Sequence, residues 1–381
     1  MQLVAYGAQD IYLTGNPQIT FFKVVYRRHT NFSMEAIEQT WNGSDTSTGR
    51  CTATISRNGD LVHRMYLEIS GTTQSTADNL CAMITDVELE IGGQKIDKQS
   101  GKWMEIWAEL TEPNTSGLVG AHAAPQVTGT PFQRMSGMGG MSHNTAAVVN
   151  SFIPLQFWFC RNPGLALPLI ALQYHEVKVI LNHVINATMT GTIRNKLWVD
   201  YIYLDTDERR RFAQVSHEYL IEQVQEQSLS EAQTNDLNFN HPVKELIWAS
   251  AGSVAGTTSA SLANPFNAIG DTAHIKLNGH DRFAPRDSRY FTRTQVWQHH
   301  TGGGGLDSTT SGAGNSNDSI AVYSFALKPE EHQPSGTCNF SRIDNAQLIT
   351  SANIAARTDI YAVNYNVLRI MSGMGGLAYS N

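Results

Sequence analysis

Three pairs of segments recur along the chain in the same order, and this repetition constrains the fold more than any other feature. The pairs are residues 60–67 with 241–248, residues 87–96 with 273–282, and Pro163-Gly164 with Pro334-Ser335-Gly336. The copies are separated by 181, 186 and 172 residues. Near-constant offsets are what a duplicated domain with loops of different length would give. We therefore expect two domains of similar design.

The repeated segments have the residue pattern of β-strands. Met65–Ile69 and Val87–Ile91 alternate apolar and polar side chains, and Val177–Leu181 is apolar except for one lysine. Turn sequences such as Asn58-Gly59-Asp60 and Gly92-Gly93 bound these runs. Charged residues make up 16% of the chain, fewer than the usual quarter or so, and small polar residues replace them. This composition is typical of short strands joined by many turns.

The length of 381 residues fits two domains of about 150–200 residues each. Helical periodicity is rare and is confined to Trp103–Leu110 and Asp205–Ala213. The second of these segments has acids in its first turn and arginines in its last. These charges interact favourably with the dipole of a helix. We expect this segment to mark the domain boundary, near residues 205–216.

The net charge of −7 and the isoelectric point near 6.0 argue against a role in binding nucleic acid directly. A coat that neutralises packed DNA usually carries a basic arm, because phosphate contacts are made by lysine and arginine. Basic residues cluster only at Arg27–Arg28 and Arg209–Arg211. We expect no direct contact with nucleic acid.

The four cysteines, Cys51, Cys81, Cys160 and Cys338, are far apart and form no CxxC pair. Buried free thiols in a reducing compartment are the favoured interpretation over disulfides. Met1–Gly15 has neither the charged start nor the long apolar core of a secretory signal. No apolar run reaches about 18 residues, so no membrane span is predicted. We expect a soluble protein made in a cytosol.

The sequence contains no recognisable catalytic, cofactor or metal site. A phosphate-binding Gly-x-x-x-x-Gly-Lys-Ser/Thr loop and a Gly-x-Ser-x-Gly elbow are both missing. His299 and His300 are adjacent, and on a strand such neighbours point to opposite faces, so we expect no shared metal. Lone histidines such as His63 and His241 are interpreted as structural or solvated rather than as metal ligands, and Asp97 as a turn carboxylate that binds backbone amides.

Two polar, glycine-rich tracts, Thr111–Asn150 and Gly302–Asn317, are predicted to be exposed loops. The hexapeptide Met-Ser-Gly-Met-Gly-Gly occurs at residues 135–140 and again at 371–376. Methionines beside glycines favour flexible, adaptable loops at both places. Six Asn-x-Ser/Thr sequons are candidate glycosylation sites, although several would occur by chance in such a composition: Asn31, Asn42, Asn114, Asn186, Asn317 and Asn339.

The opening segment resembles a known family. Residues 7–23 and 26–32 closely resemble the start of major capsid proteins from the nucleocytoplasmic large DNA viruses, especially those of algal viruses. Further matching segments follow in the order of the family: residues 55–61, 88–94, 163–177, 334–345 and 365–370. The resemblance extends over essentially the whole chain and departs mainly at Thr111–Asn150 and Ala249–Asp271.

The resemblance implies an all-β double jelly roll, in which two eight-stranded antiparallel β-sandwich domains follow one another in tandem. The expected parts are an N-terminal arm (1–21), a first jelly roll (22–204), a linker with a short helix (205–216) and a second jelly roll (217–381). Ser216–Gln227 has helix-like spacing, but the resemblance implies that it opens the second jelly roll as a strand.

The resemblance also implies a structural role without catalysis or cofactor. Three copies would form a pseudo-hexagonal capsomer, and capsomers would tile the icosahedral shell of a large double-stranded DNA virus assembled in the host cytoplasm. Met1–Gln18 would lie beneath the capsomer and contact neighbours or minor capsid proteins, and any link to the internal membrane would be indirect. Trp103, Trp107 and Phe132 fit a core position and an interface position equally well.

Three alternatives remain open at this point. A β-sandwich lectin or virion spike would use Gly302–Asn317 to bind a glycan. A jelly-roll enzyme is disfavoured because the sequence has no His-x-His. Within the family, a minor or paralogous capsid subunit would have almost the same sequence pattern as the principal one.

Overall fold

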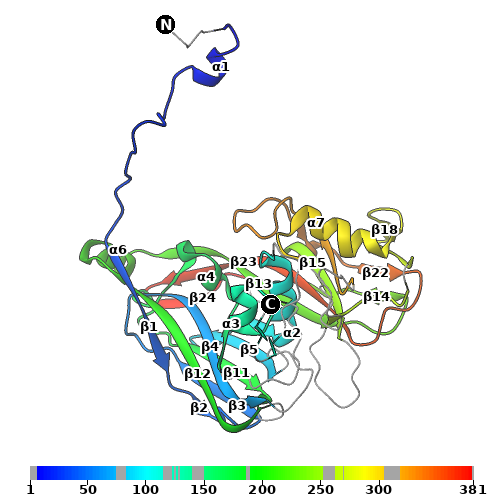
Figure 1. Ribbon diagram of the computed structural model, residues 1–381, viewed down its shortest axis with the longest axis horizontal. Coiled ribbons are helices and arrows are strands. Elements are labelled where there is room, and N and C mark those ends of the chain that lie inside the picture. The colour runs from blue at the N-terminus through cyan, green and yellow to red at the C-terminus, as the bar shows by residue number, and fades with distance from the viewer. Residues whose placement is uncertain are drawn as a thin grey trace.

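The chain folds into two antiparallel β-sandwiches that lie side by side, with the N-terminal arm extending away from them (Figure 1). The computed structural model describes residues 7–73, 83–114, 122–123, 126–127, 129–139, 150–185, 189–251, 262–268, 270–303 and 318–379. The architecture is the all-β double jelly roll that the sequence predicts.

The first sandwich consists of two five-stranded sheets. Sheet 1A has the order β1-β12-β4-β10, with β9 also paired to β4, and sheet 1B has the order β2-β3-β11-β5-β6. The strands are β1 (Phe32–Gln39), β2 (Asn42–Gly43), β3 (Gly49–Thr54), β4 (Leu61–Thr73), β5 (Ile84–Ile91), β6 (Gln94–Ser100), β9 (Asn150–Pro154), β10 (Leu167–Pro168), β11 (Val177–His183) and β12 (Met189–Leu204). A separate short hairpin joins β7 (His122–Ala123) to β8 (Gln126–Val127).

The second sandwich consists of a seven-stranded and a five-stranded sheet. Sheet 2A has the order β13-β23-β15-β16, with β20, β21 and β24 paired at its sides, and sheet 2B has the order β14-β22-β17-β18, with β19 paired to β17. The strands are β13 (His217–Ser228), β14 (Thr234–Asp236), β15 (Pro242–Ala251), β16 (Leu262–Ala263), β17 (Thr272–Leu277), β18 (His280–Asp281), β19 (Arg286–Asp287), β20 (Ile320–Ser324), β21 (Cys338–Asn339), β22 (Ala346–Thr350), β23 (Thr358–Met371) and β24 (Met374–Leu377).

The two sandwiches repeat one topology, which confirms the duplication that the sequence predicts. In sheet 1A, β4 pairs with β12, β9 and β10; in sheet 2A, β15 pairs in the same way with β23, β20 and β21. The register repeats as well, because Tyr66 pairs with Trp198 and Ile247 pairs with Tyr361. Tyr66 and Ile247 are 181 residues apart, which equals the offset between the repeated segments 60–67 and 241–248.

Each sandwich is held by its own apolar core, built from the inward residues of alternating strands. β17 and β22 bury every second residue, as one face packs on the core and the other meets solvent. The predicted strand at Ser216–Gln227 is β13, so the helix-like spacing there is overridden by pairing along the full length of β23. In Figure 1, β13 and β23 run from the second sandwich across to the first.

The helices occur at the ends of the sandwiches and in the connections. They are α1 (Ile11–Thr14), α2 (Gly101–Thr111), α3 (Pro131–Ser136), α4 (Trp158–Arg161), α6 (Thr206–Gln214) and α7 (Gln295–His299), with short turns of other helix types at η2 (Pro163–Leu165), η3 (Tyr290–Thr294) and η4 (Phe340–Arg342). The predicted helices at Trp103–Leu110 and Asp205–Ala213 are confirmed as α2 and α6. The side chains of Ser100 and Asp205 cap their first turns.

The tract Thr111–Asn150 is not a plain exposed loop, since it contains α3. Pro131 begins this helix, and the side chains of Thr130 and Gln133 form a reciprocal capping box. The second glycine-rich tract, Gly302–Asn317, lies largely outside the described residues. Only its first two positions can be placed.

The two copies of the repeated hexapeptide adopt different structures, so the prediction of two flexible loops is wrong. Residues 135–139 end α3, with Gly137 as a left-handed cap and Met138 fully buried. Residues 371–376 form a β-hairpin whose turn places Ser372 at φ 53° and Gly373 at φ 80°. The residues that precede each copy decide between these outcomes, because one copy follows a capped helix start and the other extends β23.

Candidate assembly surfaces

The junction between the two sandwiches is built around α2. This helix follows β6, and its residues Met104 and Ala108 pack into the core of the first sandwich. Its opposite side packs on the outer face of sheet 2A, the face turned away from the second core. The apolar cluster at this contact consists of Trp103, Ile106, Trp107 and Leu110 from α2 with Val224, Ile247, Ala249, Leu262, Val296, Ile320, Val322, Tyr361 and Val363.

The contacts of the aromatic residues show whether Trp103 and Trp107 are core or interface residues, a question that the sequence does not answer. Trp103 is 0% exposed, and its ring centroid lies 5.2 Å from that of Tyr361 and 5.4 Å from that of Trp107. Both tryptophans are therefore interface residues within a single chain. Phe132 is instead half-buried against the first core. Burial of this many large side chains joins the sandwiches into one block.

A charged cluster lies beside the apolar contact. Glu222 on β13 forms ion pairs with Arg161 of α4 at 3.0 Å and with the fully buried Lys244 of β15 at 2.9 Å. Burial alone would raise the pKa of Glu222, but His332, Lys244 and Arg161 outweigh it and hold the pKa at about 2. Arg161 also stacks over the ring of Trp107 at 4.4 Å, so the charged and apolar parts of the junction are continuous.

A second ion cluster surrounds His300, at the end of α7. Its Nε2 atom lies 3.1 Å from a carboxylate oxygen of Glu245, and its Nδ1 atom lies 2.9 Å from one of Glu330. Burial lowers the pKa of His300, but the two carboxylates more than compensate and raise it to about 9. Next to it, the Gly302 amide donates to the Leu110 carbonyl at 2.8 Å. A protonated His300 therefore neutralises carboxylates where α2 meets the second sandwich.

The geometry corrects the sequence argument about His299 and His300. These residues end a helix rather than occupy a strand. His299 Nδ1 lies 3.2 Å from the Leu327 carbonyl oxygen, whereas His300 points into the buried carboxylates. Within the described part of the chain, no group of three or more His, Cys, Asp or Glu residues is placed to hold a metal ion.

Asp97 joins the sandwiches at a third point. It lies on β6 and is buried, and its carboxylate accepts hydrogen bonds from the Lys98 amide at 3.0 Å and the Val224 amide at 3.2 Å. Burial raises its pKa to about 7, although these bonds and the Gln99 side chain oppose the shift. Asp97 does bind backbone amides, as the sequence suggested, but it does so across the junction.

The β23–β24 hairpin closes the junction at the other end. The Tyr174 amide of the first sandwich donates to the Gly373 carbonyl at 3.0 Å, and the Leu377 amide donates to the Gln94 side chain at 3.3 Å. A Cβ atom on Gly373 would lie 2.6 Å from the Tyr174 ring, and one on Gly375 would lie 2.7 Å from Leu172. The glycines of this hexapeptide copy therefore permit close approach to the first sandwich.

The segment before β1, which contains the predicted arm and the residues 22–31 that follow it, carries many of the exposed apolar side chains of the described chain. Residues 7–31 extend away from both sandwiches (Figure 1). The most exposed apolar side chains of this segment are Ile11, Tyr12, Leu13, Ile19, Phe21, Phe22, Val24, Val25 and Tyr26. Phe22 is 97% exposed. Exposed apolar surface of this extent is typical of interaction sites.

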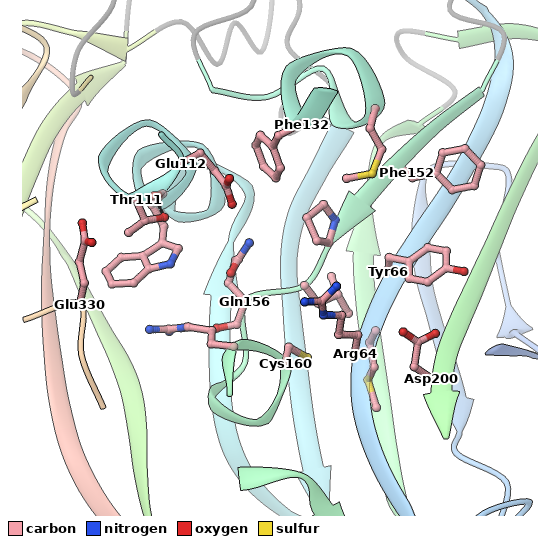
Figure 2. Close-up of a pocket in the computed structure, with 16 residues that line it drawn as sticks. Arg64, Tyr66, Thr111, Glu112, Phe132, Phe152, Gln156, Cys160, Asp200 and Glu330 are labelled. Carbon is pink, nitrogen blue, oxygen red and sulfur yellow. Dashed lines mark hydrogen bonds between the residues drawn. The ribbon is translucent and has the colours of Figure 1, made fainter. Parts of the chain in front are cut away.

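A cavity of about 670 Å³ lies between the outer face of sheet 1A and the helices α2, α3 and α4, and Glu330 of the second sandwich also lines it (Figure 2). Tyr66 and Phe152 form part of its apolar wall, and Arg64 and Asp200 are among its charged groups. Burial raises the pKa of Asp200, and Arg64 partly offsets this effect. The mixture of aromatic and charged walls suits a protein side chain better than a metal ion or a phosphate group.

Comparison with known proteins identifies the family. Residues 20–205 match the major capsid protein N-terminus, and residues 208–376 match the large eukaryotic DNA virus major capsid protein. The major capsid protein of Pyramimonas orientalis virus is 52% identical, and that of Paramecium bursaria Chlorella virus 1 is 42% identical; both alignments include 100% of this chain and 99% of the relative. The chain belongs to the major capsid proteins of large eukaryotic DNA viruses.

Solved structures agree with this membership. The quasi-atomic model of the PBCV-1 virus capsid has a TM-score of 0.76 and 38% identity, with 95% of this chain and 100% of that chain covered. The Faustovirus major capsid protein shares the fold at 13% identity, with a TM-score of 0.68. As a member of this family, the capsid protein is a structural component of the virion capsid and not an enzyme.

The candidate glycosylation sites of this capsid protein are scattered over the described surface. Asn31 is exposed just before β1, Asn42 is exposed at the start of β2, and Asn114 is half-buried after α2. Asn339 is exposed, but its side-chain oxygen caps η4 by accepting from the Ser341 amide at 3.1 Å. Asn186 and Asn317 lie outside the described residues. The structure does not gather these residues into one site.

The described cysteines are free, as the sequence predicts. Cys51 and Cys160 are buried, and burial raises the pKa of each thiol to about 12. Cys338 is only half-buried, which departs from the expectation, and Cys81 lies outside the described residues. Among the histidines, His63 is structural, since its Nδ1 atom lies 2.8 Å from the Phe159 carbonyl oxygen. None of the helices in the described ranges has the length and apolar character that a membrane span requires.

Sequence reasoning missed most of the buried ion clusters in this capsid protein. Lys244 and Glu245 interrupt a strand of buried apolar residues, and this interruption was the available signal. Their partners Arg161 and His300 lie far away in the sequence. No local pattern predicts such pairs.

Proposed function

We propose that three copies of the chain form a pseudo-hexagonal capsomer, and that capsomers tile the icosahedral shell of a large double-stranded DNA virus. The repeated topology of the two sandwiches carries this proposal. Two similar blocks per chain, repeated around a three-fold axis, give six similar blocks. Such a ring fills a hexagonal lattice position with only three chains.

The junction supports this role because a shell subunit must hold its two blocks in a fixed relation. Trp103 and Trp107 are buried at the apolar contact, and Glu222, Lys244 and Arg161 bridge the sandwiches through charge. Jelly rolls also limit exposed sheet edges, which makes each block stiff. We propose domain limits of 1–21 for the arm, 22–204 and 217–381 for the jelly rolls, and 205–216 for the linker.

The arm is the proposed contact with other shell components. Its exposed apolar side chains suit neighbouring capsomers or minor capsid proteins beneath the shell. The net charge of −7 supports a shell that does not contact the genome and meets an internal membrane only indirectly. We place assembly in the host cytoplasm, in line with the free cysteines, and regard exposed Asn31, Asn42 and Asn339 as the accessible glycan acceptors.

The solution mass of the purified protein tests the capsomer. Light scattering at micromolar concentration should give three times 42.0 kDa. A chain that lacks residues 1–21 should give three times its own mass, because the arm is proposed to act between capsomers and not within them. A protein that stays monomeric over this concentration range contradicts the proposal.

A further inference from the structure

The outer faces of sheets 1A and 2A can be compared residue by residue. Tyr66 of β4 pairs with Trp198 of β12 and Pro154 of β9. In the second sandwich, Ile247 of β15 pairs with Tyr361 of β23 and Val322 of β20. These two sets occupy the same places in the repeated topology. By the same registers, Phe152 corresponds to Ile320 and Asp200 to Val363.

These equivalent faces are covered to different extents. In the second sandwich, Ile247, Val322 and Tyr361 are 0% exposed, because α2 of the first sandwich lies on them. In the first sandwich, the equivalent Tyr66 and Pro154, together with Phe152, line the open cavity of Figure 2. The face that receives a helix in one sandwich is thus left open in the other.

The second sandwich carries a helix in the place of α2. α2 follows the β5–β6 hairpin, and η3 with α7 follows the β17–β18 hairpin after the short β19. Phe291 of this helical segment is buried in the second core, as Met104 of α2 is buried in the first. Trp297, however, is 81% exposed, whereas the tryptophans of α2 are covered by the other sandwich.

A second exposed apolar residue lies on the loop that contacts the end of α7. Leu327, which follows β20 as α4 follows β9, is 77% exposed. The hydrogen-bonding distance of 3.2 Å between His299 Nδ1 and the Leu327 carbonyl oxygen ties this loop to the end of α7. Trp297 and Leu327 are therefore two uncovered apolar residues on the segments that correspond to α2 and α4, and we refer to them together as the Trp297–Leu327 patch.

We propose that the Trp297–Leu327 patch of one copy docks into the cavity on sheet 1A of the next copy. This inference rests on the proposed capsomer and states which faces meet within it. The contact would repeat between chains the packing of α2 and α4 on sheet 2A within a chain. Because the two faces differ, the contact is heterologous, and it closes into a ring when three copies have joined.

Charge makes only a minor contribution to this pairing, because Arg64 and Arg161 line the cavity together with Glu112, Asp200 and Glu330. Arg293 precedes Trp297 by one helical turn and is exposed, and Lys328 is exposed next to Leu327. The receiving face carries Asp200 in the cavity and Glu68 beside it. Both basic residues already have a local carboxylate partner, Asp318 and Glu331. We therefore expect the apolar patch to supply affinity and the charges to favour one orientation.

The first test removes the apolar side chains of the patch. Because both side chains are exposed in the monomer, the substitutions should leave its folding stability unchanged. Trp297→Ser combined with Leu327→Ser should raise the dissociation constant of the trimer about 100-fold, as loss of an interface tryptophan typically does. Val215→Ser, at an exposed linker residue, is the matched control and should leave the trimer intact. If the wild-type protein forms trimers and the double variant associates equally well, the proposed faces are wrong while the capsomer stands.

The second test uses the heterologous geometry. Phe152→Arg blocks the cavity but keeps the patch, whereas the double variant keeps the cavity but lacks the patch. Each alone should be monomeric, and a mixture should give a species of two times 42.0 kDa, because only one intact contact is available per pair. A mixture that stays monomeric, although wild type forms trimers, would overturn the docking. A wild type that does not form trimers would instead contradict the capsomer.

Discussion

The two jelly rolls share their topology but differ in what covers their outer sheets. Sheet 2A is covered by α2 of the same chain, and every residue of β15 from Val243 to Ser250 is buried. Among the described residues, no helix of the second sandwich lies on sheet 1A, and Phe32 and Met34 of its edge strand β1 remain about half exposed at 52% and 48%. A duplicated domain can therefore keep its core and change its surface, since one face serves a contact within the chain and the equivalent face is free for another copy.

The largest expected effect comes from the covered tryptophan of this comparison. Trp103→Ala removes a fully buried side chain at the junction and should lower the free energy of unfolding by about 4 kcal/mol. Trp297→Ala, at the exposed position on the equivalent helix, should change the free energy of unfolding of the monomer by less than about 0.5 kcal/mol. Denaturant titration of both variants measures the difference. Equal losses would mean that α7 is already covered within the chain.

The next effect concerns the buried charges of the junction. Lys244→Met leaves Glu222 buried with one fewer cation and should destabilise the protein by about 3 kcal/mol. Lys328→Met breaks the exposed pair with Glu331 and should cost less than about 0.5 kcal/mol. Thermal melts of the two lysine variants separate these cases. A small effect for Lys244→Met would show that Arg161 and His332 alone stabilise the buried charge of Glu222.

The pH dependence of stability tests His300. Its pKa is about 9 in the folded chain and near 6.5 when unfolded, so its stabilising contribution is full below pH 6.5 and is lost as pH rises through 9. The expected loss is about 3 kcal/mol, because each pKa unit corresponds to about 1.4 kcal/mol. His300→Gln should remove this dependence. The folded pKa of Asp97 is also raised, so the stability linked to its protonation is lost over a lower range, from about pH 4 to pH 7. Asp97→Asn should remove this loss and leave the loss that is due to His300.

The smallest expected change in the free energy of unfolding comes from substituting two turn glycines near the junction. Gly93 and Gly373 both have left-handed φ, at 84° and 80°. An added Cβ meets nothing within 4 Å at Gly93, whereas it would lie 2.6 Å from the Tyr174 ring at Gly373. Gly93→Ala should cost about 1 kcal/mol through backbone strain alone, and Gly373→Ala about 2 kcal/mol or more. Equal costs in denaturant titrations would mean that Tyr174 moves freely aside.

Much of the fold was predictable because it depends on local patterns that repeat. The alternation in β4 and β5, the turn at Gly92-Gly93 and the offset of 181 residues between Tyr66 and Ile247 all predicted two similar sandwiches. The helix α6 followed from its charge order. The resemblance to capsid proteins added the strand at β13, where periodicity alone favoured a helix.

The surfaces were less predictable, because they depend on partners distant in sequence. His299 and His300 are adjacent, yet one is half-exposed and the other is buried between two carboxylates from separate segments. One hexapeptide ends a helix in its first copy and turns a hairpin in its second. Trp103 is buried because sheet 2A packs on it, and Trp297 is exposed because no sheet of the described chain does. The residues next to either tryptophan in the sequence do not predict this difference.

Negative-stain images of the purified wild-type protein test the central claim most directly. If two equivalent jelly rolls per chain build the capsomer, class averages should show three-fold particles with six similar lobes around a ring. Particles with three lobes, or single two-lobed chains without rings at micromolar concentration, would contradict the account.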